Sequence, residues 1–419
     1  MNKMEWKRRT YIEGTVEAQI SSFIGEGGTT EYHVLLSVTN NHLSFAEQFQ
    51  ALQQAYSRCL ESELNAGAVA VFRRYFLSDV ANQADWVMAW ECEQTQCALS
   101  LLQQAPLNGT KVALWAWLVT NTSITTEMNG MVLARRGEYT HMWTAGAYNK
   151  ASNAEYQTRL LLNDYVMQLM AKGCTLAKDC IRTWFFVQNV DVNYAGVVKA
   201  RKEVFLTQNL TEETHYIAST GIEGRSADPS VLVTMDTYAI QGLLPDQIQF
   251  LYAPSHLNPT YEYGVTFERG TVVTYGDRKQ IFISGTASID NRGEIVAPGN
   301  IINQAKRMME NVEALLAEAG ATWKDVMQAI VYLRDLADYQ VVSDFLAEEY
   351  PGLPCLLVHA PVCRPGWLCE TECIAVIPVS NEIYAPFLFY QLFLLYIDIY
   401  LKLSVVYIRY SNNKYNFSH

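Results

Sequence analysis

Hydrophobic and polar residues follow one pattern that occurs three times along this chain. Apolar residues at the i, i+3 and i+4 spacing of an amphipathic helix predict first helices at 44–64, 153–173 and 300–319. Apolar runs typical of buried strands follow them, at 68–79, 179–190 and 326–336. Second helices are predicted at 81–93, 193–207 and 337–350. Closing strands are predicted at 111–119, 231–240 and 370–379, and strands before each first helix at 31–38, 139–147 and 280–288.

The recurring order of strand, strand, helix, strand, helix and strand predicts a mixed α/β (α+β) fold of three fused copies of one small unit. The repeat is too long for a solenoid. The joints fall near 120–130 and 245–262, and the second is rich in proline and turn residues, as a linker is. We therefore expect units at 1–125, 126–250 and 260–382.

The tail, residues 383–419, departs from this pattern because Phe, Leu, Ile, Tyr, Asn and Lys dominate it. These residues have AT-rich codons, which suggests read-through or a frameshift that added a segment without selected structure. The rival interpretation is a membrane anchor. The apolar run 385–397 contains Gln391 and stops at Asp398, so it is shorter than the roughly 20 residues of a spanning helix. We therefore expect a tail outside the fold and no membrane partner.

The charge balance argues against a nucleic-acid partner. The formal net charge is −12, and the densest basic runs, at 135–141 and 199–202, are short, whereas nucleic-acid binders usually present a basic surface. The nine cysteines show no metal-ligand spacing. Their odd number, with no signal segment, favours reduced thiols in the cytoplasm. We expect no metal and no cofactor, and a small molecule as the partner.

The stretch HAPVCRPGWLCETE, residues 359–372, raises a question about two glutamates. Glu370 and Glu372 lie in a predicted strand, although glutamate is depleted in strands and is rarely buried without a partner. Pro-Gly is a strong turn signal, so the sequence predicts a hairpin of 355–363 and 368–379 around the turn at 364–367. Because side chains alternate along a strand, both glutamates then share one face, toward a neighbouring unit.

The third unit resembles the RidA-like (reactive intermediate deaminase) family in its strand IFISGTAS, its Gln-bearing helix, the Ala-Gly turn and the run VYLRD. That family forms trimers with sites in the clefts between neighbouring domains. The resemblance therefore implies an internal pseudo-trimer, present as a monomer or a higher homo-oligomer. Its deaminases carry an arginine just after a proline at the start of the penultimate strand, to hold the substrate carboxylate. Here that strand, LPCLL at 353–357, contains no arginine.

A narrower branch matches more closely. The segment CRPGWLCE, residues 363–370, resembles the C-R-x-x-x-L-x-E signature of the chorismatases, which release pyruvate from chorismate. The segment 182–205, which begins RTW, and IASTGIEG at 217–224 resemble further parts of that family. The resemblance extends over roughly 140–380 and implies a chorismatase-like enzyme that forms a hydroxybenzoate or a dihydroxycyclohexadiene carboxylate.

The resemblance assigns candidate roles to carboxylates, a thiol and arginines. Glu370 is the acid that protonates the enolpyruvyl group, and Glu372 lies nearby as a substrate contact or as the partner of an arginine from another unit. Cys363 matches the cysteine of the branch that forms 3-hydroxybenzoate, or is a small core residue. Because chorismate is a dicarboxylate, bidentate arginines suit it. The arginine candidates, each of which could instead be a surface cation, are Arg201, Arg182 and Arg364.

Smaller residues complete the candidate site. A polar loop of Ser219, Thr220 and Gly221 could offer hydroxyl and backbone donors to a carboxylate. The strand end from Gly285 through Ala287 to Ser288 would leave room for a ring, or would simply pack tightly. Tyr194 could hydrogen-bond the substrate, although tyrosine is common in this chain. Two alternatives remain: an enamine or imine deaminase, and a non-catalytic small-molecule-binding protein.

Overall fold

The computed structural model describes residues 3–25 and 28–379, and the described residues up to Ile377 form one compact unit. The predictions for the tail at 383–419 lie outside the described residues. Within the part that is described, no helix is both long enough and apolar enough to cross a membrane.

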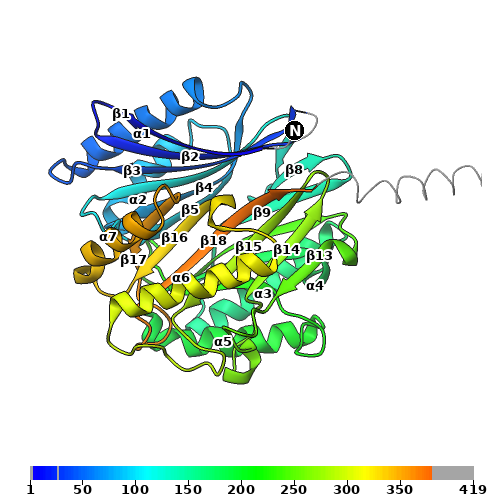
Figure 1. The fold of residues 1–419 in the computed structure, drawn as a ribbon. Coiled ribbons are helices and arrows are strands. Elements are labelled where there is room, and N and C mark those ends of the chain that lie inside the picture. The colour runs from blue at the N-terminus through cyan, green and yellow to red at the C-terminus, as the bar shows by residue number, and fades with distance from the viewer. Residues whose placement is uncertain (1–2, 26–27, 380–419) are drawn as a thin grey trace, which may run out of the picture. The chain divides into compact units, whose positions relative to one another are not determined.

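The described residues form three six-stranded sheets, each built from one continuous stretch of chain (Figure 1). The first has the order β1-β2-β3-β6-β4-β5, with β1 (Lys3–Tyr11), β2 (Val16–Ile24), β3 (Thr30–Val38), β4 (Val69–Leu77), β5 (Ala98–Gln103) and β6 (Val112–Val119). The second has the order β11-β10-β12-β9-β8-β7, with β7 (Ser123–Thr126), β8 (Val132–Arg136), β9 (Tyr139–Tyr148), β10 (Cys180–Val187), β11 (Ala218–Glu223) and β12 (Val233–Gln241). The third has the order β13-β14-β15-β18-β16-β17, with β13 (Ile248–Leu251), β14 (Gly270–Tyr275), β15 (Arg278–Ala287), β16 (Val326–Leu333), β17 (Cys355–His359) and β18 (Cys369–Pro378). The prediction of three fused α+β units is confirmed.

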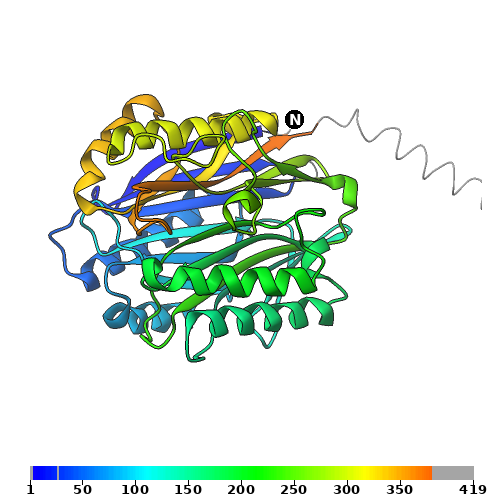
Figure 2. The ribbon, with the colours of Figure 1, turned by 90° about the horizontal axis from the view of Figure 1, so that it is seen from below.

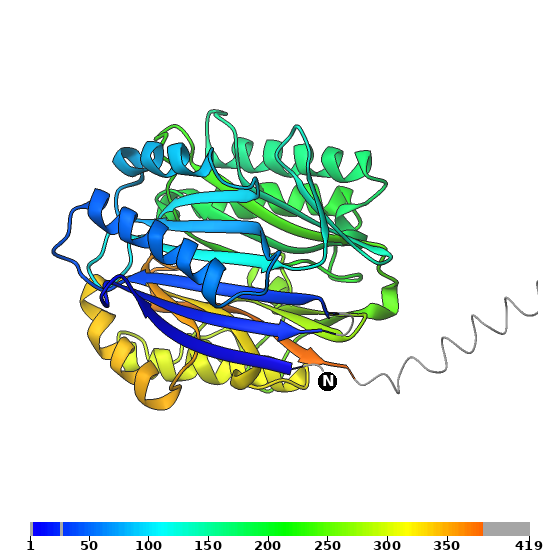
Figure 3. The same cartoon turned by 90° about the horizontal axis from the view of Figure 1, so that it is seen from above.

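Each unit has two main helices, and their first turns explain where they begin. The helices are α1 (Phe45–Ser62), α2 (Val80–Glu91), α3 (Ala154–Ala171), the short α4 (Leu176–Asp179), α5 (Val190–Thr207), α6 (Ile301–Glu318) and α7 (Tyr339–Glu349). Ser44, Asn153 and Asn300 cap the first helix of each unit by accepting a hydrogen bond from a backbone N–H of the first turn. The helices lie on the outside and the sheets turn their other faces inward (Figures 2 and 3).

Aromatic residues from all three units fill the space between the inward faces. The ring centroids of Trp115 and Trp184 are 6.3 Å apart, and those of Trp117 and Phe282 are 6.4 Å apart. Tyr238 lies 5.2 Å from Trp117 and 5.3 Å from Phe282, so rings from the first, second and third units are in contact. The inward faces of the three units therefore share one core, while separate hydrophobic clusters lie between sheet and helices in the first and second units.

The local predictions at 355–379 and 217–224 were wrong. Strands β17 and β18 are not a hairpin, because both pair with β16, β17 in parallel and β18 antiparallel on the other side. The segment between them therefore crosses the end of β16. Residues 219–221 belong to strand β11, which pairs in parallel with β10, and do not form a loop. The joint predicted as a linker at 245–262 contains β13, which pairs with β14.

Candidate active site

A narrow cavity lies where the second and third units meet. Helix α5, strand β11, strands β15 and β18 and the segment that leads into β18 all contribute to its lining. Nine residues predicted from the sequence line it: Tyr194, Arg201, Ser219, Gly221, Gly285, Ala287, Cys363, Arg364 and Glu370. The volume open to a water-sized sphere is about 20 Å³, which is room for about one water. Entry of a larger molecule therefore requires side chains at the rim, such as the exposed Arg364, to move.

Glu370 is the buried acid of this cavity. It is 3% exposed and lies on β18 opposite Tyr332 of β16. Burial, and next the negative charge of Glu372, raises the pKa of its carboxyl group to about 8. Its Oε1 has no hydrogen-bond partner among the described residues. Gly285 lies against the carboxyl group, since a Cβ at that position would be 2.8 Å from the Glu370 Cδ. The carboxyl group is therefore mostly protonated at neutral pH and faces the cavity.

Arg201 supplies a buried positive charge to the same cavity. It is 1% exposed, its Nε donates to Thr266 Oγ1 at 3.1 Å and its Nη1 donates to Ser219 Oγ at 3.5 Å. Both partners are uncharged, and its Nη2 has no hydrogen-bond partner within the described part of the chain. A buried charge without a counterion is costly, so an anionic ligand would complete this arrangement.

Cys363 and Tyr194 lie together beside Glu370. Burial, and next the charge of Glu370, raises the pKa of the Cys363 thiol to about 12, while a hydrogen bond with Tyr194 opposes the shift. The sulfur is therefore a neutral thiol and not a thiolate nucleophile. The Tyr194 ring packs on Gly221, where a Cβ would be 2.6 Å from Tyr194 Cε2. Glycine at 221 is thus needed for the tyrosine to reach the cavity.

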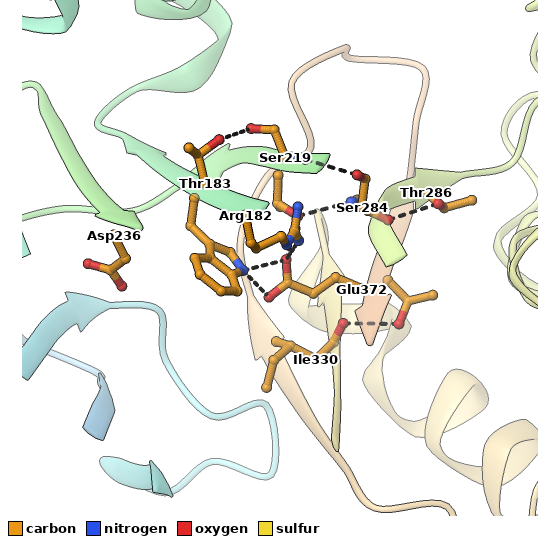
Figure 4. Close-up of polar contacts among 12 residues, drawn as sticks. Arg182, Thr183, Ser219, Asp236, Ser284, Thr286, Ile330 and Glu372 are labelled. Atoms are coloured by element: carbon orange, nitrogen blue, oxygen red, sulfur yellow. Dashed lines mark hydrogen bonds and ion pairs between the residues drawn. The ribbon is translucent and has the colours of Figure 1, made fainter. Parts of the chain in front are cut away.

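Arg182, Thr220 and Glu372, which the sequence predicted to contact substrate, are not among the residues that line the cavity. They form a buried network of hydrogen bonds, of which Figure 4 shows Arg182 and Glu372. Arg182 donates to Glu372 at 2.7 Å and to Thr220 Oγ1 at 2.5 Å, and the Thr220 hydroxyl donates to Glu372. The Trp184 indole N–H also donates to Glu372, at 2.9 Å. Glu372 is therefore the partner of an arginine from another unit, the alternative that the sequence left open.

A hydrogen bond from a backbone N–H connects this network to a residue that lines the cavity. The Gly285 N–H donates to Thr220 Oγ1 at 2.9 Å, which ties β15 of the third unit to β11 of the second. Because Gly285 lies against the Glu370 carboxyl group, the network fixes one wall of the acid's surroundings.

Sequence reasoning missed Arg269 and several apolar lining residues. The apolar ones are Val265, Phe267, Ile289 and Trp367. Arg269 donates to the Asn258 carbonyl at 2.9 Å, and its Cζ lies 5.5 Å from the Phe267 ring centroid. It follows the segment that was predicted to be a linker, so no pattern drew attention to it. The one available signal was the sequence FERG at 267–270, in which Arg269 follows an acidic residue directly before a strand.

A metal site is not evident in the part of the chain that the structure describes. No group of three or more His, Cys, Asp and Glu side chains there is placed to hold an ion. The groups that meet at the cavity are one neutral carboxylic acid, a thiol, a phenol and three arginines. This set can bind an anion and deliver a proton.

Comparisons with known proteins agree with this architecture. The family model described as Endoribonuclease L-PSP matches residues 271–377. A RutC family protein of Pyrococcus abyssi is 45% identical over 77 residues, which are 17% of this chain and 60% of that protein. The 3-aminoacrylate deaminase RutC of Acinetobacter baylyi is 30% identical over 99 residues, 23% of this chain and 77% of that protein. A chorismatase crystal structure superposes with a TM-score of 0.58 at 17% identity, over 75% of this chain and 95% of that one, which shows a shared fold.

Proposed function

This chain belongs to the RutC family of RidA-like proteins, and on that premise we propose that it is a chorismatase-like enzyme that releases pyruvate from chorismate. The observation that carries the proposal is Glu370, a buried carboxylic acid that keeps its proton at neutral pH in the same cavity as Arg201, whose Nη2 has no hydrogen-bond partner among the described residues. The fold shared with a chorismatase supports it.

Glu370 fits the first chemical step. The enolpyruvyl ether of chorismate does not react until its methylene carbon accepts a proton. The protonated Glu370 donates that proton, which leaves an oxocarbenium carbon that water or a ring hydroxyl can attack. On the water route the resulting hemiketal collapses to pyruvate and a dihydroxycyclohexadiene carboxylate, so one water is consumed. General acid catalysis of this kind typically contributes about 10²–10⁴-fold.

The arginines fit the charge of the substrate. Chorismate carries two carboxylates, and the cavity presents Arg201, Arg269 and Arg364 within a chain of net charge −12. Arg201 and Ser219 lie on the side of the second unit, whereas Arg364 lies on the segment that leads to Glu370. Bidentate contacts from planar guanidinium groups would orient the ring so that the enolpyruvyl carbon faces the acid.

Cys363 bears on which product forms. As a neutral thiol beside Glu370, it presents a small, weakly polar surface to the ring and does not compete for the proton. We propose the route to 3-hydroxybenzoate, in which chorismate yields pyruvate and the hydroxybenzoate with no net uptake of water. Release of the dihydroxycyclohexadiene acid is the other outcome of the same protonation.

Deamination of a carboxylate-bearing enamine is the second candidate, because a relative is named as a 3-aminoacrylate deaminase. Protonation of an enamine at carbon resembles protonation of an enol ether, so Glu370 could serve either reaction. The family's arginine, however, is missing from β17 and also from β11, the equivalent strand at this cavity. Arg201 of α5 supplies the positive charge instead, which favours chorismate.

The test is incubation of the full-length protein with chorismate, following pyruvate by a coupled assay and the aromatic products by chromatography. We expect pyruvate release to fall about 10²–10⁴-fold in Glu370→Gln and to be unchanged in Glu348→Gln, an exposed control on α7. A folded protein that releases ammonia from 3-aminoacrylate but no pyruvate from chorismate would establish the deaminase. Full activity of Glu370→Gln would reject the acid role.

A further inference from the structure

A second and more open cleft lies between the third and first units, and none of its lining residues lines the candidate active site. Its volume is about 460 Å³, within the range of about 300–1,000 Å³ that is common for small-molecule sites. One wall is helix α7 with strand β17, and the other comes from β2, β3 and the loop before β6. Strand β17, which lines the cleft, is the edge strand of the third sheet (Figure 1).

This cleft is equivalent by internal symmetry to the candidate active site. Strand β17 takes the place of β11, since the His359 N–H donates to the Ala105 carbonyl at 2.8 Å just as the Glu223 N–H donates to the Pro361 carbonyl at 3.1 Å. The isolated bridge of Val358 with Pro106 likewise matches that of Ile222 with Val362. Two clefts with the same backbone layout thus present different side chains.

The acid is absent from the second cleft. The last residue of β16, Leu333, pairs with Cys369, and the last residue of β4, Leu77, pairs with Val112. The residue after Cys369 on β18 is Glu370, and the residue after Val112 on β6 is Ala113. Glu370 lines the candidate active site and Ala113 lines the second cleft. No carboxylic acid of the described residues therefore occupies the position from which Glu370 faces a ligand.

The buried arginine is replaced as well. Helix α5 lines the candidate active site with Tyr194 and Arg201. Helix α7 and the residue after it line the second cleft with uncharged side chains instead, namely Tyr339, Ser343, Leu346, Ala347 and Tyr350. Burial raises the pKa of Tyr350 to about 12, so this phenol stays uncharged at neutral pH.

The remaining charges cancel at the rim. Of the described residues that line the second cleft, Arg8 is the one cation, and its Nε lies 3.4 Å from a carboxylate oxygen of Glu17. The other polar side chains are uncharged, among them Ser37, Asn108 and Ser343, beside apolar surface from Leu356 and Ala113. A dianion would lose its hydration here without gaining an unpaired cation, whereas an uncharged polar ring would keep both hydrogen bonds and apolar contact.

We propose that the cleft between the third and first units is a binding site for an uncharged, ring-sized polar molecule, which it holds without transforming. The proposal is independent of the reaction at Glu370, because it depends on the shape and neutral lining of a different cleft. The gene product would then use one fold twice, once with an acid and arginine and once with neither.

The test uses 4-fluorobenzamide as the uncharged probe and 4-fluorobenzoate as its anionic counterpart, each followed by fluorine NMR line broadening on the full-length protein. We expect the amide to bind with a dissociation constant on the order of 1 mM or tighter. Ser343→Trp fills the cleft from α7 and should abolish that broadening. Glu348→Trp adds the same side chain at an exposed position of the same helix and should leave it unchanged.

Ser37→Trp fills the cleft from the opposite wall. It gives a second test of binding in case Ser343→Trp does not fold. Equal broadening of the amide in the wild type and in both filled variants would overturn the proposal. So would absence of binding to the wild type at millimolar protein, or broadening of the benzoate that the two filled variants abolish to the same degree. Loss of the amide broadening in either folded variant, with no matching loss for the benzoate, supports it.

Discussion

At the scale of single residues, the surroundings of Glu370 set a pH limit on the proposed reaction. The carboxyl group must carry its proton to act as an acid, and its pKa is raised to about 8. We expect kcat/KM for pyruvate release to be level at lower pH and to fall about tenfold per pH unit above about pH 8. A pH series with the wild type checks this. A profile that falls from pH 5 onward would show an acid of ordinary pKa and contradict the assignment.

The same raised pKa makes a prediction for stability that needs no substrate. Because the folded carboxyl group holds its proton up to about pH 8, whereas an unfolded one loses it near 4.5, the folded state binds more protons between these values. The free energy of unfolding therefore falls as pH rises through this window. Glu370→Gln, which cannot ionise, should be more stable relative to the wild type at pH 9 than at pH 6. Urea midpoints at both values measure it, and an equal difference at the two would reject a raised pKa.

At the scale of elements, the side chain of Thr220 joins β11 to β15. Its oxygen accepts from Arg182 and from the Gly285 N–H, and its hydroxyl donates to Glu372. Thr220→Val keeps the shape but leaves buried donors and an acceptor without partners, which costs about 1–3 kcal/mol. We expect that loss of unfolding free energy together with a lower kcat, because Gly285 is no longer held against Glu370.

Thr220→Ser is the matched control, since it keeps the hydroxyl and loses one methyl group. It should recover most of the stability and the pH profile of the wild type. If serine and valine were equally harmful, packing of the methyl group rather than the hydrogen bonds would explain the effect.

Element prediction from the sequence succeeded where the signal was periodic and failed where it was local. The helices at 45–62, 154–171 and 301–318 were found because an apolar stripe persists over several turns. The short strands β5 and β13 lack such length. The Pro-Gly turn at 365–366 was recognised, but a turn signal cannot say whether the following strand pairs with its neighbour or crosses over β16. Glu370, Arg201 and Cys363 were found through a resemblance, whereas the partners of Glu372 come from another unit, which no local pattern reveals.

At the scale of the whole described molecule, the three units differ in what they place at equivalent positions. Strand β18 of the third unit carries Glu370 at the cleft between the second and third units, and β6 of the first unit carries Ala113 at the cleft between the third and first units. A homotrimer of identical chains must place the same residues in every cleft. Fusing the copies removes that constraint, so one cleft can keep an acid while another loses it, and the charge of each can suit a different ligand.

The centre of the molecule is also where the three units are held together. Arg74 of β4 donates to Asp236 of β12 at 2.8 Å and lies 3.7 Å from Glu372 of β18, all fully buried. Its Cζ is also 4.7–5.2 Å from four aromatic ring centroids. Arg74→Met would leave two buried carboxylates with one fewer cation between them, which costs about 3–5 kcal/mol. Because the cluster joins all three units, we expect one cooperative urea transition that shifts as a whole.

Two further variants make this prediction specific to the buried cluster. Arg8→Met removes an exposed arginine that pairs with Glu17, and should cost about 1 kcal/mol or less. Adding Asp236→Asn to Arg74→Met removes one of the stranded carboxylate charges and should recover part of the loss, as charges in one network do not act additively. If Arg74→Met instead split unfolding into separate steps, and the urea midpoint of the first step did not fall, the units would fold independently. A shift of the single transition, partly restored in the double variant, would mean that the shared buried charges make three copies fold as one body.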